Sequence, residues 1–286
     1  MTTPLQNAPV NVPVEKAARD LVVEPGWTSP LTLVREVRRS WPLVMALARK
    51  SFFVQYRRTA FGLFWAVGLP VVQALILAFV FSRVARFDVP HYAVYVISGM
   101  VPWTYFTSTL LVGATSVVDN SALASKIYFP RAVLPLSMAM TNAYGLGIGS
   151  FVTVAFAACY RAGPGWHTLL IIPAVLLLIV LVASFVLALS VAHVYLRDTR
   201  YLVTAATLGW LWVTPVVYPL SQAHGVLRTV IEINPMSGIV ETFHAAVYTT
   251  PLDGSLLLTT AAWAVGLATV AVALHARYDR VLVDLL

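Results

Sequence analysis

Long stretches without any acidic or basic residue make up most of the chain. Six of them are long enough to hold a membrane span, at 59–82, 89–118, 132–160, 162–196, 201–227 and 254–276. A bilayer core about 30 Å thick needs about 20 apolar residues for one helical crossing. Apolar and polar residues do not alternate with a period of two inside these stretches, which favours helices over strands. The pattern therefore predicts an all-α, polytopic membrane protein with six transmembrane helices.

The six spans fall within one transmembrane domain over 41–280. We place them at about 60–82, 92–118, 133–158, 169–195, 202–218 and 255–276. The fourth span begins near Leu169, because Gly163 and Pro164 are a turn signal at the start of its stretch. Residues 1–40 are expected to form a flexible cytosolic N-terminus, and residues 281–286 a cytosolic C-terminus.

Three segments outside the spans carry patterns of their own. Residues 41–58 predict an amphipathic interface helix, with Pro42 in its first turn. A basic flank of the first span is the alternative for this segment. Residues 119–132 predict a short cytosolic helix that ends before Pro130. Residues 219–253 are too long for a turn and predict one or two external re-entrant helices.

Composition and charge agree with a membrane protein. The chain is 59% hydrophobic and 11% charged, with a mean hydropathy of +0.80, whereas about a quarter of the residues are charged in soluble domains. Thirteen basic residues fall on one side of the predicted spans and four on the other. Because short loops rich in Lys and Arg stay in the cytoplasm, both termini are expected inside. The net charge of +7 then follows from topology and contact with anionic membrane lipid, and implies no nucleic acid partner.

The chain lacks the sequence patterns that catalysis or nucleotide binding requires. No G-x-x-x-x-G-K-[ST] run occurs, so no nucleotide is expected to bind here. All twelve acidic residues fall outside the predicted spans, which disfavours a proton-coupled carrier. External acids such as Asp88 and Glu232 are scattered and have no metal-ligand spacing to a histidine. With Cys159 as the single cysteine, we expect no catalytic residue, no metal and no cofactor in this chain.

Aromatic residues give the positive signal. The second span carries four of them near one face, Tyr92, Tyr95, Trp103 and Phe106. In the fifth span Trp210 and Tyr218 share a face. Rings stack on the apolar faces of sugars while their OH and NH groups form hydrogen bonds, so these faces favour a path for a sliding glycan. Trp and Tyr also populate the interface belts of membrane proteins, and that alternative stays open.

Several short runs, in this order along the six-span map, resemble one known family. They are Tyr56-Arg57-Arg58-Thr59 with Gly62, Trp65 and Pro70; Asn120, Leu123, Lys126, Phe129-Pro130-Arg131 and Leu134-Pro135; Arg197-Asp198; Pro215-Val216-Val217-Tyr218; and Asn234-Pro235. Over about residues 40–280 the chain resembles the permease subunits of ABC transporters that export O-antigen, teichoic acid and related lipid-linked glycans. His244 is a departure, because members of the family more often carry Arg there.

The resemblance implies a transport subunit and not an enzyme. It implies a homodimer of this chain in the cytoplasmic (inner) membrane, joined by two copies of a separate ATPase that binds ATP and Mg. The residues implied to couple to that ATPase are Asn120, Lys126, Phe129, Pro130, Arg131, Arg197 and Asp198. Arg57 and Arg58 are implied to contact the lipid pyrophosphate, and both also fit plain topology anchors. The six aromatic residues are implied to line a glycan channel between protomers.

The substrate has alternatives. Arg outnumbers Lys sixteen to three, which is typical of a GC-rich genome, so a cell-wall galactan fits as well as the O-antigen of a lipopolysaccharide. An ABC-type exporter of a small molecule or drug is the second interpretation. A membrane-embedded glycolipid-modifying enzyme is the third, and it predicts turnover by the purified chain without ATP or a partner.

Overall fold

The computed structural model describes residues 29–57, 59–84, 89–124, 129–159, 165–248 and 250–278. Every regular element in these residues is helical, in agreement with the predicted all-α class. The helices are α2 (Pro30–Arg39), α3 (Trp41–Tyr56), α4 (Trp65–Val84), α5 (Tyr92–Asp119), α6 (Ser121–Ala124), α7 (Val133–Cys159), α8 (Ile171–Tyr195), α9 (Thr199–Trp210), α10 (Gly225–Ile233), α11 (Ser237–Tyr248) and α12 (Gly254–Tyr278). Short 3-10 turns lie at Gly62–Phe64, Trp166–Leu170, Leu211–Val213 and Leu220–Gln222.

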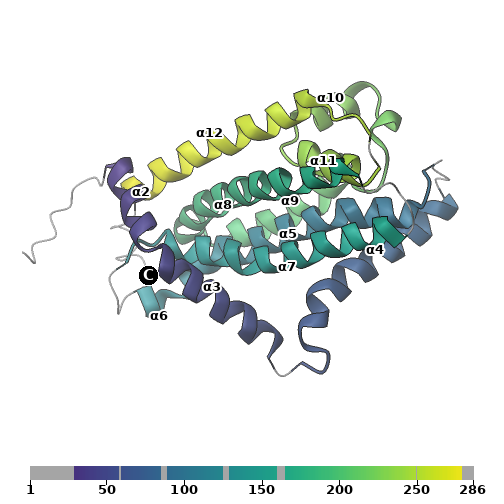
Figure 1. Ribbon diagram of the computed structural model, residues 1–286. Coiled ribbons are helices and arrows are strands. Elements are labelled where there is room, and N and C mark those ends of the chain that lie inside the picture. The colour runs from purple at the N-terminus through teal and green to yellow at the C-terminus, as the bar shows by residue number, and fades with distance from the viewer. Residues whose placement is uncertain are drawn as a thin grey trace, which may run out of the picture.

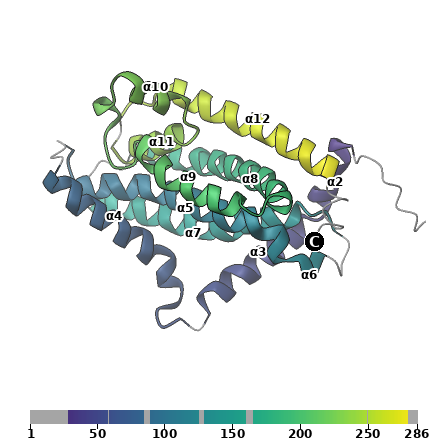
Figure 2. The ribbon, with the colours of Figure 1, turned by 180° about the vertical axis from the view of Figure 1, so that it is seen from behind.

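The long helices form a bundle around α5. Helix α5 packs against both α7 and α8, α12 lies along α8, α4 lies along α5, and α3 packs on α7. Figures 1 and 2 show α2 and α6 at one end of the bundle and α10 and α11 at the other. We call these the α6 end and the α11 end. Helices α3 and α4 lean away from the bundle and converge at their facing ends (Figure 1).

Helix α5 is the most enclosed of the long helices because small residues let its neighbours come close. A Cβ added at Gly113 would lie 2.5 Å from a methyl carbon of Val186 on α8, so only glycine fits at this crossing. With 28 residues, α5 is about 42 Å long, which is enough to cross a bilayer core. Its central residues, among them Val96 and Phe106, are fully buried.

Two hydrophobic clusters hold the bundle together. The larger one lies between α5, α7, α8 and α11. The second lies at the α6 end, where Val44 of α3, Val117 of α5 and Val191 of α8 surround Phe129 and Leu134. We call it the α6-end cluster. The cluster joins residues from four helices and from the segment after α6. Because its side chains are close-packed, a displacement of one of these segments shifts the others.

Three helical stretches have the length and apolar character of membrane spans, namely Val133–Cys159, His167–Tyr195 and Gly254–Tyr278. Gly68–Arg83 is a shorter apolar helix of the same kind. These agree with four of the predicted spans. The full count of six stays a prediction, because α5 is more polar and the fifth predicted span is interrupted.

The fifth predicted span, 202–218, is not one continuous helix. Helix α9 ends at Trp210, a 3-10 turn follows to Val213, and Thr214 is extended with φ −116° and ψ 132°. Pro215 comes next, and the ring of a proline disfavours helical geometry in the residue before it. The expected helical face shared by Trp210 and Tyr218 therefore does not exist. We call residues 214–218 the break.

The N-terminal part contains more structure than expected. Residues 30–39, assigned to a flexible segment in the sequence, form α2, which buries Leu33 and contacts α12. The predicted interface helix is present as α3. Its stripe of Val44, Ala48 and Phe52 is buried, while Trp41 stays 42% exposed. Part of the predicted apolar face thus packs on the bundle.

The segments at the two ends match the predictions in part. A helix of four residues, α6, opens the predicted cytosolic helix at Ser121, and residues 125–128 lie outside the described residues. The external segment 219–253 holds two helices, α10 and α11, as predicted. Helix α10 exposes Val226, which is 82% accessible, and α11 is almost wholly buried. The depth of either helix in a membrane stays a prediction.

Gly238→Ala is expected to destabilise the protein. An added Cβ would lie 2.4 Å from the Leu256 carbonyl oxygen of α12 and 2.5 Å from the Thr260 hydroxyl. Because a backbone atom cannot move away cheaply, a loss of about 1–3 kcal/mol is expected. The measurement is the temperature at which half of the detergent-purified protein loses its monodisperse peak in size-exclusion chromatography.

Gly266→Ala is the matched control for this substitution. A Cβ there meets no described atom within 4 Å, so the variant is expected to gain about 0.4–1 kcal/mol. Equal midpoints for the two variants would contradict the close approach of α11 to α12.

Candidate functional site

The break after α9 is held by the side chain of Asn234, which is 6% exposed. Its carboxamide oxygen accepts hydrogen bonds from the Trp210 indole N–H at 2.9 Å and from the Met236 backbone N–H at 3.0 Å. Its nitrogen donates to the Val213 carbonyl oxygen at 2.9 Å and to the Thr214 hydroxyl at 2.8 Å. Both donors and both acceptor positions of the amide are thereby used. Asn234 thus joins the end of the 3-10 turn, the start of the break and the segment before α11 through one buried side chain.

Tyrosine hydroxyls complete the same region. Tyr92 and Tyr95 of α5 donate to the carbonyl oxygens of Val217 and Tyr218, the second at 3.1 Å. The Tyr218 hydroxyl donates to the Trp212 carbonyl oxygen at 3.0 Å. Four of the six aromatic residues predicted to form a glycan path, Tyr92, Tyr95, Trp210 and Tyr218, therefore converge on the break and its flanks. Each of these four side chains donates a hydrogen bond to another residue of the chain.

The other two predicted aromatic residues lie further along α5. Phe106 is fully buried, and its ring packs edge-to-face on Phe185 at 5.8 Å and on Trp210 at 5.1 Å. Trp103 packs on Phe106 and also lines a hollow of about 510 Å³ between α4 and α5, beside Leu211. Of the six, Trp103 is the one that the structure places on this hollow. A role of these rings in a sugar path stays a prediction.

His244 of α11 is a buried residue whose setting was not foreseen. Its ring stacks on Tyr95 with centroids 3.8 Å apart, and Nδ1 lies 3.9 Å from the Glu241 carboxylate. Among the described residues, neither ring nitrogen has a hydrogen-bond partner. A Cβ at Gly99 would lie 2.9 Å from the imidazole Nε2 and 2.8 Å from the Val216 carbonyl oxygen, so α5, α11 and the break meet here. The sequence signal was only that His244 departs from the resembled family.

The residues predicted to couple to an ATPase are partly internal. Phe129 is 5% exposed at the centre of the α6-end cluster. The guanidinium of Arg131, itself buried, donates to the Phe129 carbonyl oxygen at 2.5 Å and lies 5.5 Å from that ring. Pro130 between them is buried as well. Asn120 donates to the Ser116 carbonyl oxygen at 2.8 Å and so caps α5. Lys126 lies outside the described residues.

Arg197 and Asp198 are exposed on the tight loop between α8 and α9. The Asp198 carbonyl oxygen accepts the Tyr201 backbone N–H at 2.9 Å as α9 begins. Because Val191 and Val194 near the end of α8 belong to the α6-end cluster, this loop lies at the same end of the bundle as Phe129. The predicted coupling residues therefore gather at one end.

The predicted lipid-phosphate residues are separate from the break. Arg57 directly follows the last residue of α3 and is exposed. Arg58 lies outside the described residues. No group of three or more potential metal ligands occurs among the residues that the structure describes.

Comparison with known proteins places this architecture in a family. The sequence pattern of the ABC-2 type transporter family matches residues 42–248, which include α3, α6, the break and α11. The chain belongs to the membrane family of ABC-2 type transporters, and is thus a multi-pass transport protein and not an enzyme, as the sequence resemblance predicted.

Two curated relatives make the resemblance more specific. An O-antigen export system permease protein from Myxococcus xanthus is 27% identical over 220 residues, covering 76% of this chain and 85% of the relative. A protein of the same description from Klebsiella pneumoniae is 26% identical over 199 residues, covering 69% of this chain and 77% of the relative.

Asn234→Leu is expected to destabilise the break and lower the thermal stability of the protein. The leucine fills the space but leaves the Trp210 N–H, the Val213 carbonyl and the Met236 N–H without their partner, and each buried unpaired group costs about 1–3 kcal/mol. Trp210→Phe removes one of the same bonds and is expected to cost less. For both variants the measurement is the temperature at which half of the detergent-purified protein loses its monodisperse peak in size-exclusion chromatography. Wild-type stability of Asn234→Leu would contradict the role assigned to this amide.

Proposed function

We propose that the chain is the membrane subunit of an ATP-driven ABC exporter that moves a lipid-linked polysaccharide from the cytosolic to the external side of the cytoplasmic (inner) membrane. The observation that carries this proposal is the similarity to O-antigen export permeases over most of both chains. The absence of a nucleotide-binding run in the sequence supports a separate ATPase as the source of energy. The transported glycan is then the substrate, and the ATPase binds ATP and Mg.

The α6 end is the docking face for that ATPase in this proposal. A homodimer of the chain with two ATPase copies would present two such faces to the cytosol, together with both chain termini. The exposed pair Arg197 and Asp198 offers polar groups for docking. Phe129 and Arg131 act one layer deeper, because they anchor the segment after α6 to the bundle.

The α6-end cluster supports a route for the mechanical signal. Close-packed side chains transmit displacement, so a push on the segment at Phe129 moves α3, α5, α7 and α8 together. In the proposed mechanism this movement parts two protomers enough to admit the lipid diphosphate. The planar guanidinium of Arg57, and that of Arg58, suit phosphate oxygens at the cytosolic rim. Trp103 would then offer the first aromatic surface to the glycan, at the hollow between α4 and α5.

Asp198→Lys is expected to uncouple the ATPase without unfolding the chain. The residue is exposed, so its charge reversal leaves the cores intact. Because the proposal puts Asp198 on the docking face, the reversal is expected to weaken association with the ATPase about tenfold or more. The measurement is ATP hydrolysis by the purified complex of chain and ATPase, with and without a lipid-linked glycan. The glycan is expected to raise the rate of ATP hydrolysis by the wild-type complex, and the variant complex is expected to lose that increase.

Glu232→Lys at the α11 end is the matched charge reversal. It breaks only a surface ion pair with Arg228, worth at most about 1 kcal/mol, so stimulation by glycan is expected to persist. Phe129→Ala is unsuitable for this test, because emptying its buried site would cost about 3–5 kcal/mol of stability. Failure of the two proteins to associate would overturn the proposal, and association without any glycan effect would favour another exported substrate.

A further inference from the structure

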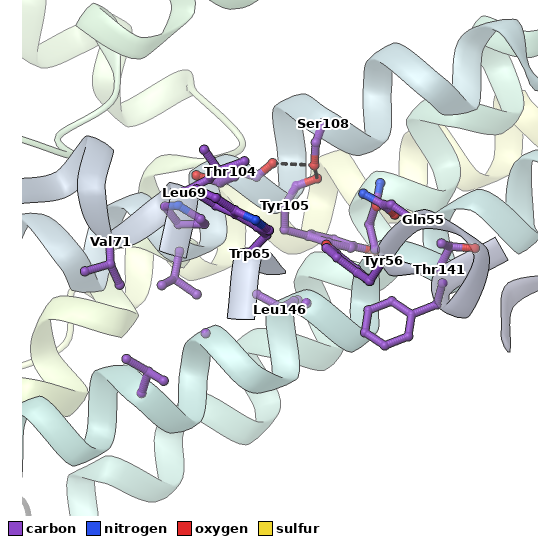
Figure 3. A pocket seen from close by; sticks show the side chains of 17 residues that line it. Gln55, Tyr56, Trp65, Leu69, Val71, Thr104, Tyr105, Ser108, Thr141 and Leu146 are labelled. Atoms are coloured by element: carbon purple, nitrogen blue, oxygen red, sulfur yellow. Dashed lines mark hydrogen bonds between the residues drawn. The ribbon is translucent and has the colours of Figure 1, made fainter. Parts of the chain in front are cut away.

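A cavity of about 180 Å³ lies between α3, α4, α5 and α7, where α3 and α4 lean away from the bundle (Figures 1 and 3). It shares Thr104 and Ser108 of α5 with the hollow beside Trp103 and Leu211, and its other lining residues differ. Figure 3 shows that its side chains come from all four helices, with Gln55 and Tyr56 of α3 and Trp65 of α4 facing Thr104, Tyr105 and Ser108 of α5.

The walls of this cavity carry neutral polar groups. In the part of the chain that the structure describes, the buried Thr104 hydroxyl has no hydrogen-bond partner. Asn142 of α7 donates from its nitrogen to the Thr109 hydroxyl at 3.1 Å, so its oxygen can accept from a ligand. Burial raises the pKa of the Tyr56 phenol, which therefore stays neutral and can donate. None of the residues placed around the cavity is Asp, Glu, Lys or Arg.

This chemistry selects one class of ligand. The Tyr105, Ser108 and Thr141 hydroxyls already donate to backbone carbonyl oxygens. The Thr104 hydroxyl and the Asn142 carboxamide oxygen still need hydrogen-bond partners, and a purely apolar chain would leave them unsatisfied. The uncharged walls give no compensation for a phosphate. The rings of Trp65 and Tyr105 offer flat apolar faces of the kind that stack on sugars. Drug-sized ligands occupy pockets of about 300–1,000 Å³, so this smaller cavity fits a single sugar unit and not a length of glycan.

Gly145 keeps the cavity open from the α7 side. The run Gly145, Gly147 and Gly149 contains a G-x-x-x-G pattern typical of helix packing, and Gly149 does pack, since its added Cβ would lie 3.0 Å from Val101. Gly145 and Gly149 both line the cavity, but a Cβ at Gly145 meets no described atom within 4 Å. A side chain added at Gly145 would therefore start in open space and extend into the cavity.

We propose that this cavity binds one uncharged sugar, the one nearest the lipid anchor of a membrane glycolipid, with the lipid tail leaving between α3 and α4. The inference rests on the proposed function in taking that sugar to be the first residue of the exported lipid-linked glycan. Arg57, which follows Tyr56 at the end of α3, then stands near the phosphate that joins sugar and lipid. A glycolipid of the surrounding membrane offers the same sugar and tail chemistry, and the test separates the two sources.

Photolabelling of the full chain in phosphatidylcholine nanodiscs tests the site. Three diazirine probes are compared, a hexosyl diphosphoprenol, a hexosyl diacylglycerol and phosphatidylcholine itself, and labelled peptides are mapped by mass spectrometry. Gly145→Leu fills the cavity and is expected to lower sugar-probe labelling of the lining segments of α5 and α7 at least about tenfold. Gly147→Leu is the matched control, because Gly147 is exposed, lies outside the cavity and meets no described atom either. It is expected to label like wild type.

The outcomes separate the site from the export function. Labelling by the hexosyl diphosphoprenol that Gly145→Leu lowers and Gly147→Leu leaves unchanged supports the inference in full. The same labelling by the hexosyl diacylglycerol alone supports a sugar site and overturns its tie to the exported glycan. Labelling by phosphatidylcholine that Gly145→Leu also lowers overturns the inference, because the cavity then accepts an acyl chain. Absence of Gly145-sensitive labelling by any probe overturns it as well. None of these readouts needs the ATPase, so they stand apart from the coupling test.

Discussion

The need to satisfy every backbone polar group away from water governs this structure. Continuous helices such as α7, α8 and α12 meet it internally, and in a bilayer no water is available to replace a missing bond. The chain nevertheless interrupts its fifth apolar stretch at Thr214, where Pro215 follows. Side chains take over at that point, because Asn234 uses all its donors and acceptors and Tyr95 of α5 reaches the Tyr218 carbonyl. The break is thus a built feature, stabilised from two other helices, and not a frayed end.

This arrangement ties the two ends of the bundle to one helix. Helix α5 contacts the break through Tyr92 and Tyr95 at its start, and it reaches the α6-end cluster through Val117 near its last turn. Between these points Gly113 brings α8 into close contact. Helix α5 is held at both ends, so a displacement at Phe129 is carried toward the break over about 35 Å of a helix that includes Pro102. That geometry suits a transport subunit driven from one side of a membrane.

The sequence predicted the parts that depend on local pattern. Apolar runs located α7, α8 and α12, and the short cytosolic helix predicted over 119–132 contains α6. Helix α2 was missed because its short run has few apolar residues and its burial of Leu33 depends on α12. The shared face of Trp210 and Tyr218 was wrong because a periodicity argument carries a helix through Pro215. Asn234 was singled out only by the family resemblance, because the sequence does not show that its side chain would have four hydrogen-bond partners. The open space at Gly145 was hidden by a pattern that usually means packing.

The most direct test of this account asks whether the two ends face opposite sides of the membrane. In a Cys159→Ala background, single cysteines replace Arg200 at the start of α9 and Thr229 on α10, both exposed positions. A membrane-impermeant maleimide applied to intact spheroplasts is predicted to label Thr229→Cys, and to label Arg200→Cys only after the membrane is opened. Labelling of both cysteines from the same side would contradict a bundle that carries a cytosolic push to the external end.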